Sequence, residues 1–351
     1  RDSYKGKQNL PIKSICQISQ NELCLGTDGK GTKIFNIPKQ LITDYPFDNN
    51  YLDSGTSKVH SVLKDNAGNL WIAIYQKGVM MIPAQPNSFK YIGYKSINKN
   101  IIGSNCITSL CRDHEGILWI GTDNDGIYGI TTELKQKVHY APHDSPSSVP
   151  STVFGLYEDS EHNLWFGSYT NGLGRLNKKT GQCSYLQNLT DKNGNRIQRV
   201  YDLVEDQDKR LWIATMGAGL FYYDLKTGQS VYDPKFNAAT KKYKWISCLL
   251  YAGDNHLYVG TYDGIRCIDL STDDFKTEEI LSRHIIHSLY EDPQGNIWIG
   301  SSDGLAEWNP QTRQLKTYTT AHGLSSNAVY AIKGDCLLYT SPSPRDSTSS
   351  R

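Results

Sequence analysis

Short runs of alternating apolar and polar residues fill the chain, and turn-forming residues separate them every few positions. In one unit, Val59-His60-Ser61-Val62-Leu63 is followed by a turn at 65–69, a second run at 70–74, a third at 79–82 and a fourth at 91–94. A period of two is typical of strands, and Asp, Asn and Gly between the runs are typical of hairpin turns. The pattern predicts four-stranded antiparallel sheets and very little helix.

This unit recurs along the chain. An apolar-aromatic-apolar motif, such as Leu70-Trp71-Ile72, appears at intervals of 40 to 48 residues. Its central residues are Cys24, Trp71, Trp119, Trp165, Trp212, Tyr258 and Trp298. Strand repeats of this length are typical of β-propellers, in which one four-stranded sheet forms each blade. We predict an all-β fold, a β-propeller of about seven four-stranded antiparallel blades.

The aromatic residue of each unit is expected to be structural. A single four-stranded sheet cannot bury both of its faces, so successive blades must stack. The side chains expected to fill the space between blades are Trp71, Trp119, Trp165, Trp212, Tyr258 and Trp298. Because Cys24 and Tyr258 replace tryptophan, the first and sixth blades are expected to pack less regularly.

The repeat also defines the expected organisation of residues 1–335. The repeat cores lie near 15–36, 59–82, 106–130, 152–176, 200–224, 245–269 and 285–308, and a further blade starts at 323–335. Two arrangements stay open, because the seven blades could close one ring or belong to two consecutive propellers.

The repeat stops after Asp335. The next tryptophan is due at position 341, where Ser341 stands instead, and residues 336–346 resemble a translated sequencing adapter. Residues 336–351 are therefore expected to be a non-native or disordered tail.

Five of the seven recurring hairpins start with an aspartate, six residues before the aromatic residue. These aspartates are Asp65, Asp113, Asp159, Asp206 and Asp292, and Ala252 takes the position in the sixth unit. Five carboxylates in order could suggest acid–base chemistry or calcium binding. One carboxylate per blade at a hairpin start is, however, what capping of a turn requires, since Asp accepts hydrogen bonds from the backbone of its own turn.

Composition narrows the classes of function. The chain has 37 Lys and Arg against 36 Asp and Glu, a net charge of +1, which does not indicate nucleic-acid binding. No Cys-x-x-Cys pair is present, and His284 and His287, the closest two histidines, lack a nearby third ligand. No catalytic residue, metal site or cofactor is expected.

Ligand binding is expected in the loops that do not repeat. The loops between second and third strands, and those that lead into each blade, cluster at one face of a propeller. The candidate ligand-binding residues there are Tyr75, Asp123, Asn124, Asp125, Tyr169, Arg199, Trp245, Tyr262 and Asp263. Aromatic rings can stack on the C–H face of a sugar, while carboxylates, amides and guanidinium groups bond its hydroxyls. Ordinary polar loops with occasional aromatic residues are the alternative.

Two segments carry a family resemblance. The motif Asp292-Pro293-Gln294-Gly295-Asn296-Ile297-Trp298-Ile299-Gly300-Ser301 and the segment Gly323-Leu324-Ser325-Ser326-Asn327-Ala328-Val329-Tyr330 resemble the two-component regulator propeller repeat, and the resemblance extends over about residues 12–335. WD-type repeats would instead show Gly-His and Trp-Asp dipeptides, which are absent here in register.

The resemblance implies a function in sensing. Members of this family are typically hybrid sensors of gut Bacteroidetes, with periplasmic propellers, a transmembrane helix and a cytoplasmic histidine kinase. It implies a periplasmic fragment of a membrane-anchored, homodimeric sensor that detects an oligosaccharide released from a glycan, with no enzymatic activity in this fragment and no binding of nucleic acid. A secreted propeller lyase or glycosidase and an interaction scaffold are the alternatives.

Overall fold

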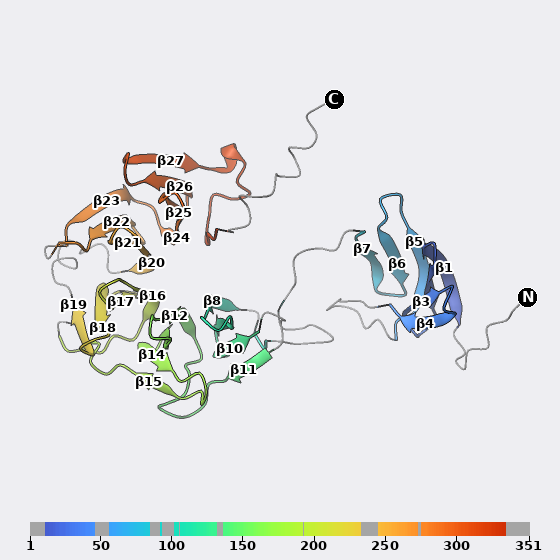
Figure 1. The fold of residues 1–351 in the computed structure, drawn as a ribbon, viewed down its shortest axis with the longest axis horizontal. Helices are drawn as coiled ribbons and strands as arrows, with labels where there is room; N and C mark the ends of the chain where they lie inside the picture. Colours follow the sequence, from blue (N-terminus) through green and yellow to red (C-terminus); the bar gives the residue numbers. More distant parts are fainter. Residues whose placement is uncertain are drawn as a thin grey trace, which may run out of the picture. The chain divides into compact units, whose positions relative to one another are not determined.

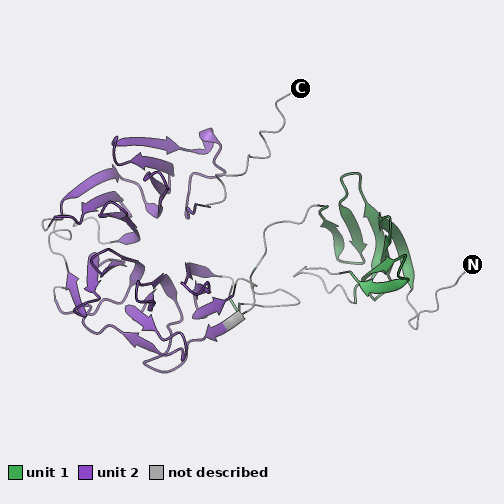
Figure 2. Ribbon diagram, in the orientation of Figure 1, with its two compact units in different colours: residues 1–105 green, residues 106–351 purple. Residues whose placement is uncertain are grey.

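The computed structural model describes residues 11–45, 56–84, 92, 102–104, 106–131, 136–191, 193–232, 245–272 and 275–334. In these residues the chain forms 27 strands and a single turn of 3-10 helix, η1 (Thr320–His322), so that the fold is all-β as predicted. The chain divides into two compact units, residues 1–105 and residues 106–351 (Figure 2). No helix in the described part is long and apolar enough to cross a membrane.

The smaller unit contains two sheets. The first consists of β1 (Ile12–Ser19), β2 (Glu22–Thr27), β3 (Thr32–Asn36) and β4 (Leu41–Asp44). The second has three strands, β5 (Val59–Lys64), β6 (Leu70–Ile74) and β7 (Gly78–Ile82). Its expected fourth strand, at 91–94, lies outside the described residues except for Ile92.

The larger unit contains five four-stranded sheets, the third to seventh blades of the chain. The third consists of β8 (Ile107–Arg112), β9 (Leu118–Thr122), β10 (Ile127–Ile130) and β11 (Gln136–Tyr140). The fourth consists of β12 (Val153–Glu158), β13 (Leu164–Ser168), β14 (Leu173–Leu176) and β15 (Cys183–Tyr185). The fifth consists of β16 (Val200–Glu205), β17 (Arg210–Thr215), β18 (Leu220–Asp224) and β19 (Gln229–Tyr232). The sixth consists of β20 (Ile246–Ala252), β21 (His256–Thr261), β22 (Gly264–Asp269) and β23 (Thr277–Ser282). The seventh consists of β24 (Ile286–Glu291), β25 (Ile297–Ser301), β26 (Gly304–Asn309) and β27 (Gln314–Tyr318).

Every sheet is an antiparallel meander in which strands follow the order of the sequence. In the larger unit the first strands, β8, β12, β16, β20 and β24, contact one another from blade to blade. These strands therefore lie on the inside of the arc that the five blades form, and the fourth strands lie on its outside (Figure 1). This is the architecture of propeller blades, and it confirms the predicted fold class.

The hydrophobic core lies between neighbouring sheets. Trp165 on β13, for example, packs in one buried cluster with Leu211 and Phe221 of the next blade. Trp119, Trp165, Trp212 and Tyr258 are all buried, and Trp298 is half-buried. In the larger unit the aromatic side chain thus packs between its own sheet and the sheet of the adjacent blade.

Trp71 differs from this expectation. Its side chain is 39 % exposed, and Leu63, Val79 and Met81 on the same sheet are exposed as well. Within the smaller unit, no described sheet packs on this face of the second blade, so the Trp71 ring packs only against its own sheet.

The recurring aspartate accepts hydrogen bonds both from its own turn and from the aromatic residue of the motif. In the fourth blade, Asp159 Oδ1 accepts a hydrogen bond from the Asn163 backbone N–H at 2.8 Å, and Asp159 Oδ2 accepts one from Trp165 Nε1 at 2.7 Å. The carboxylate therefore caps its turn and also fixes the indole that packs against the next blade. Residues 335–351, which include the expected tail, lie outside the described part of the chain.

Candidate functional site

One backbone hydrogen bond recurs in all seven blades, at the same end of each sheet. The N–H of the residue after the second strand donates to the carbonyl of the residue before the first strand, 17 positions earlier. The donor–acceptor pairs, which we call the rim pairs, are Asp28–Pro11, Tyr75–Lys58, Asp123–Cys106, Tyr169–Thr152, Met216–Arg199, Tyr262–Trp245 and Ser302–Ile285. Each blade therefore places two side chains of variable identity at equivalent positions.

In the larger unit, neighbouring rim pairs contact each other across blades. Thr152 Oγ1 donates to Asp123 Oδ1 at 2.8 Å. The Arg199 guanidinium carbon lies 4.9 Å from the ring centroid of Tyr169, a cation–π contact. These contacts link the rims of the third, fourth and fifth blades.

The row continues into the sixth blade. Met216 forms an isolated β-bridge with Trp245, and the rings of Trp245 and Tyr262 are 5.7 Å apart. The rim pairs from Asp123 to Tyr262 thus form one continuous row over four blades, which we call the rim row.

Aromatic rings in the rim row are only partly covered. Tyr169, Trp245 and Tyr262 are 41 to 44 % exposed, whereas Trp119, Trp165, Trp212 and Tyr258 between the blades are buried. Exposed rings beside a carboxylate and a guanidinium group offer apolar faces together with hydrogen-bonding groups. This combination suits a polyhydroxylated ligand, which has C–H faces and hydroxyl groups.

The other predicted ligand residues have different places. Tyr75 belongs to the rim of the smaller unit, where its ring stacks on His60 at 5.2 Å. Asp125 accepts a hydrogen bond from the Tyr128 hydroxyl and lies 3.4 Å from His139 Nε2, so its carboxylate is engaged within its own sheet. Asn124 has φ +87° in the tight loop, and its N–H donates to Ser151 O.

Asp263 follows Tyr262 in its loop, and its backbone carbonyl accepts the Arg283 N–H at 3.0 Å. Sequence reasoning missed Thr152, although it lies between two predicted residues in the rim row. The constant separation of 17 positions between the members of each rim pair is the signal that identifies it.

A titratable carboxyl group lies on the inner strand β16. Asp202 accepts backbone hydrogen bonds from Leu203 at 2.9 Å and from Leu249 of the next blade at 2.8 Å. Burial raises the pKa of Asp202 to about 6, and the two hydrogen bonds only partly oppose that effect. Ser14 accepts the corresponding bond from Val62 in the smaller unit, so the bond itself has a structural role in joining blades.

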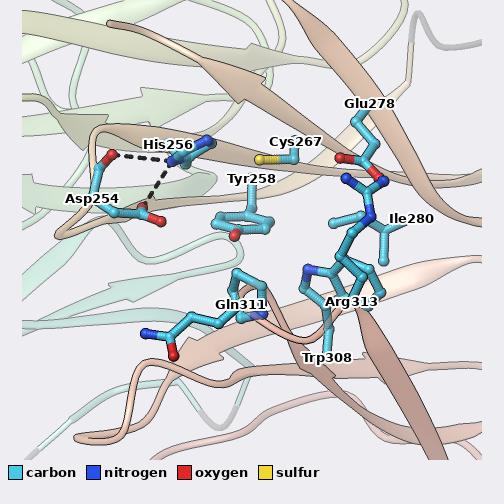
Figure 3. Close-up of a pocket in the computed structure, with 10 residues that line it drawn as sticks. Asp254, His256, Tyr258, Cys267, Glu278, Ile280, Trp308, Gln311 and Arg313 are labelled. Atoms are coloured by element: carbon cyan, nitrogen blue, oxygen red, sulfur yellow. Dashed lines mark hydrogen bonds and ion pairs between the residues drawn. The ribbon is translucent and has the colours of Figure 1, made fainter.

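A small cavity lies between the sixth and seventh blades, at the end of the sheets opposite the rim (Figure 3). Its volume is about 230 Å³, and Tyr258, Cys267 and Trp308 line its inner part. The cavity borders Tyr258, which stands where five other blades have tryptophan. A phenol ring is smaller than an indole, so it leaves more space beside the next blade.

Polar groups around this cavity are already paired. His256 contacts Asp254 at 3.0 Å, and Arg313 forms an ion pair with Glu278. Burial raises the pKa of the Cys267 thiol to about 12, which keeps it protonated and unreactive. We therefore interpret the cavity as a packing defect of the sixth blade, and the rim row as the candidate ligand site.

Comparison with known proteins identifies the repeats. The family model described as "Two component regulator propeller" matches residues 101–124, 147–170, 191–217 and 280–303. These segments include the first hairpins of the third, fourth, fifth and seventh blades.

Relatives of known structure share the fold. The extracellular domain of a protein assigned as a one-component system of B. thetaiotaomicron is 20 % identical, with a TM-score of 0.57 over 88 % of this chain and 43 % of that chain. The extracellular domain of a protein assigned as a hybrid two-component system of the same organism is 21 % identical, with a TM-score of 0.52 over 90 % of this chain and 48 % of that chain.

A curated relative, "Histidine kinase P4" of Formosa agariphila, is 21 % identical over 90 % of this chain and 20 % of its own length. The chain therefore spans a fifth of that kinase and less than half of each structural relative. The four matched segments are similar to the repeat described as "Two component regulator propeller", and they agree with the resemblance in the sequence.

Proposed function

We propose that this chain is the ligand-sensing part of a hybrid two-component sensor, and that its rim row binds an oligosaccharide derived from a glycan. The observation that carries the proposal is the continuity of the rim row, from Asp123 on the third blade to Tyr262 on the sixth. A ligand with repeating units suits a row of repeating positions.

The chemistry of the rim row supports a sugar over an apolar or a highly charged ligand. Its rings alternate with Asp123, Thr152 and Arg199, which supply hydrogen-bond acceptors and donors. The cation–π contact holds Arg199 against the face of Tyr169, so both side chains are ordered before a ligand arrives. Such preorganisation reduces the entropic cost of binding.

The relatives support a role in signalling. Their names describe a histidine kinase and extracellular domains of one- and two-component systems. We place this chain in the periplasmic part of a membrane-anchored, homodimeric parent protein, where ligand binding changes the signal that reaches the kinase. The fragment itself is assigned no catalytic role.

A panel of glycan-derived oligosaccharides, screened by isothermal titration calorimetry, tests the proposal. For a binding sugar, Tyr262→Ala or Tyr169→Ala should weaken affinity roughly 3- to 10-fold, the range for loss of one ring contact. Leu315→Ala removes an exposed apolar side chain from the outer strand β27 and serves as the control. Equal affinity in all variants would refute the rim row as the site, and release of shorter sugars during incubation would indicate an enzyme.

A further inference from the structure

Two histidines and a glutamate from neighbouring blades meet at the end of the sheets opposite the rim row. His114 lies in the turn between β8 and β9, His162 lies in the turn between β12 and β13, and Glu158 ends β12. Each residue offers one ligand atom, and these atoms all lie within 4.8 Å of one another. The two imidazole rings stack with centroids 3.7 Å apart, and His114 Nδ1 lies 2.8 Å from Glu158 Oε1.

We propose that His114, Glu158 and His162 form a binding site for a divalent transition-metal ion such as zinc, which joins the third and fourth blades. Two imidazoles and one carboxylate are a donor set that zinc commonly uses, with water at the remaining position. His114 and His162 are exposed, so an ion and its water can reach them from solvent, while Glu158 is half-buried and fixed in place. The proposal is independent of the sugar-sensing function.

The turn that holds His162 has a backbone conformation that recurs in other blades. His162 has φ +66°, in the left-handed region. The equivalent turn position is glycine in three other blades, at Gly68, Gly116 and Gly295, all with positive φ. Lys209 and Asn255 occupy this position in the fifth and sixth blades, also with positive φ, so the conformation belongs to the turn and is compatible with several side chains.

The interface between the fourth and fifth blades shows what these positions do without histidine. There, Glu205 takes the place of Glu158 and accepts a hydrogen bond from the Ser160 N–H at 2.6 Å, just as Glu158 accepts one from the His114 N–H at 2.7 Å. Lys209 stands at the position of His162 and forms an ion pair with Glu205 at 3.4 Å. The glutamate therefore joins blades in both interfaces, and this structural role does not require the two imidazoles.

Lys178 is the group that competes for Glu158. Its ammonium contacts Glu158 Oε1 and also lies 3.2 Å from Asp113 Oδ2, so it keeps a partner if the metal takes Glu158. Burial raises the pKa of Glu158, but hydrogen bonds from Lys178 and His114 outweigh that effect and hold the pKa below its usual value.

Zinc titration of the full chain by calorimetry tests the site, in a Cys106→Ser, Cys336→Ser background. Cys106 is exposed and Cys336 lies outside the described residues, so both thiols are removed as competing ligands. We expect one saturable zinc ion per chain. His162→Gly and His114→Ser should each weaken binding about tenfold or more.

Both substitutions introduce the residue that another blade uses at the same position, so the metal-free variants should keep the melting temperature of the background protein. His284→Ser is the matched control, because its imidazole contacts Asp303 at 2.8 Å and belongs to no group of three possible ligands in the described residues. This variant should bind zinc like the background protein.

Electron paramagnetic resonance with one equivalent of Cu²⁺ provides a second readout. The spectrum should show coupling to two nitrogens in the background protein and to fewer in His162→Gly. The proposal is overturned if no saturable zinc binding occurs up to about 0.1 mM free metal, where a micromolar site would be filled. It is also overturned if both histidine variants bind zinc as tightly as the background protein.

Discussion

Trp212 donates its indole N–H to Asp206 Oδ2 at 2.7 Å, across the first hairpin of the fifth blade. The same bond, 2.7 to 2.9 Å long, occurs in the second, third, fourth and seventh blades. It links the turn at one end of the hairpin to the ring that packs against the next blade. The repeated aspartate therefore has a structural role in each of these blades.

Removal of this carboxylate should affect stability and leave ligand binding intact. Asp159→Ala leaves Trp165 Nε1 and the Asn163 N–H without their acceptor, and unpaired buried donors cost about 1–3 kcal/mol each. We expect a decrease of roughly 2 kcal/mol or more in the free energy of unfolding, measured by urea denaturation. Weaker sugar binding at a temperature where the variant is fully folded would show that Asp159 also acts at the ligand site.

Truncation of the repeated tryptophan should have unequal effects in the two units. Trp165 is 3 % exposed, so Trp165→Ala should lower the free energy of unfolding by about 3–5 kcal/mol. Trp71 is 39 % exposed, and Trp71→Ala should cost clearly less. Thermal and urea unfolding of both variants measures the difference, and equal losses would mean that this face of the second blade is covered in solution.

The charge of Asp202 should make stability depend on pH. Its pKa rises from 3.8 to about 6 on folding, so the folded protein binds the proton more tightly than the unfolded chain. The free energy of unfolding should therefore decrease as the pH rises from about 4 to about 6, and should stay lower above that range. Asp202→Asn should remove this slope. Because its amide can accept only one of the two backbone hydrogen bonds, its free energy of unfolding should be lower than that of wild type at pH 4 and should change little up to pH 7.

Urea denaturation of both proteins between pH 4 and pH 7 measures the effect. Asp224→Asn is a suitable control, because hydrogen bonds from the Thr227 and Lys226 backbone lower the pKa of Asp224, so its effect on the slope falls below about pH 4 and the wild-type slope between pH 4 and pH 7 should remain. The same slope in wild type and Asp202→Asn would assign the pH dependence to other groups.

The sequence was sufficient to predict the blades, because strand alternation, turn residues and the aromatic residue all repeat with one period. It did not show that the chain divides between the second and third blades, since Trp71 and Trp119 are separated by an ordinary repeat distance. The rim row and the His114–His162 pair depend on contacts between blades. Residues at equivalent positions of successive repeats become neighbours only once the sheets stack, so proximity along the sequence was a poor guide to both.

The sixth blade offers a test of how the repeat fills space. Ala252 and Tyr258 are both 1 % exposed and stand where aspartate and tryptophan occur in five other blades. Ala252→Asp alone should destabilise the protein, because it buries a carboxylate without the indole N–H that binds it elsewhere. Tyr258→Trp alone should fill part of the adjacent cavity but leave its N–H without that acceptor.

The double variant should recover stability, because the two new side chains can form the bond that Asp206 and Trp212 form in the fifth blade. A double-mutant cycle on the free energies of unfolding should give a favourable coupling of about 0.5–3 kcal/mol, the range for residues in direct contact. Additive effects would contradict this account, because they would mean that the new aspartate and tryptophan do not form this bond.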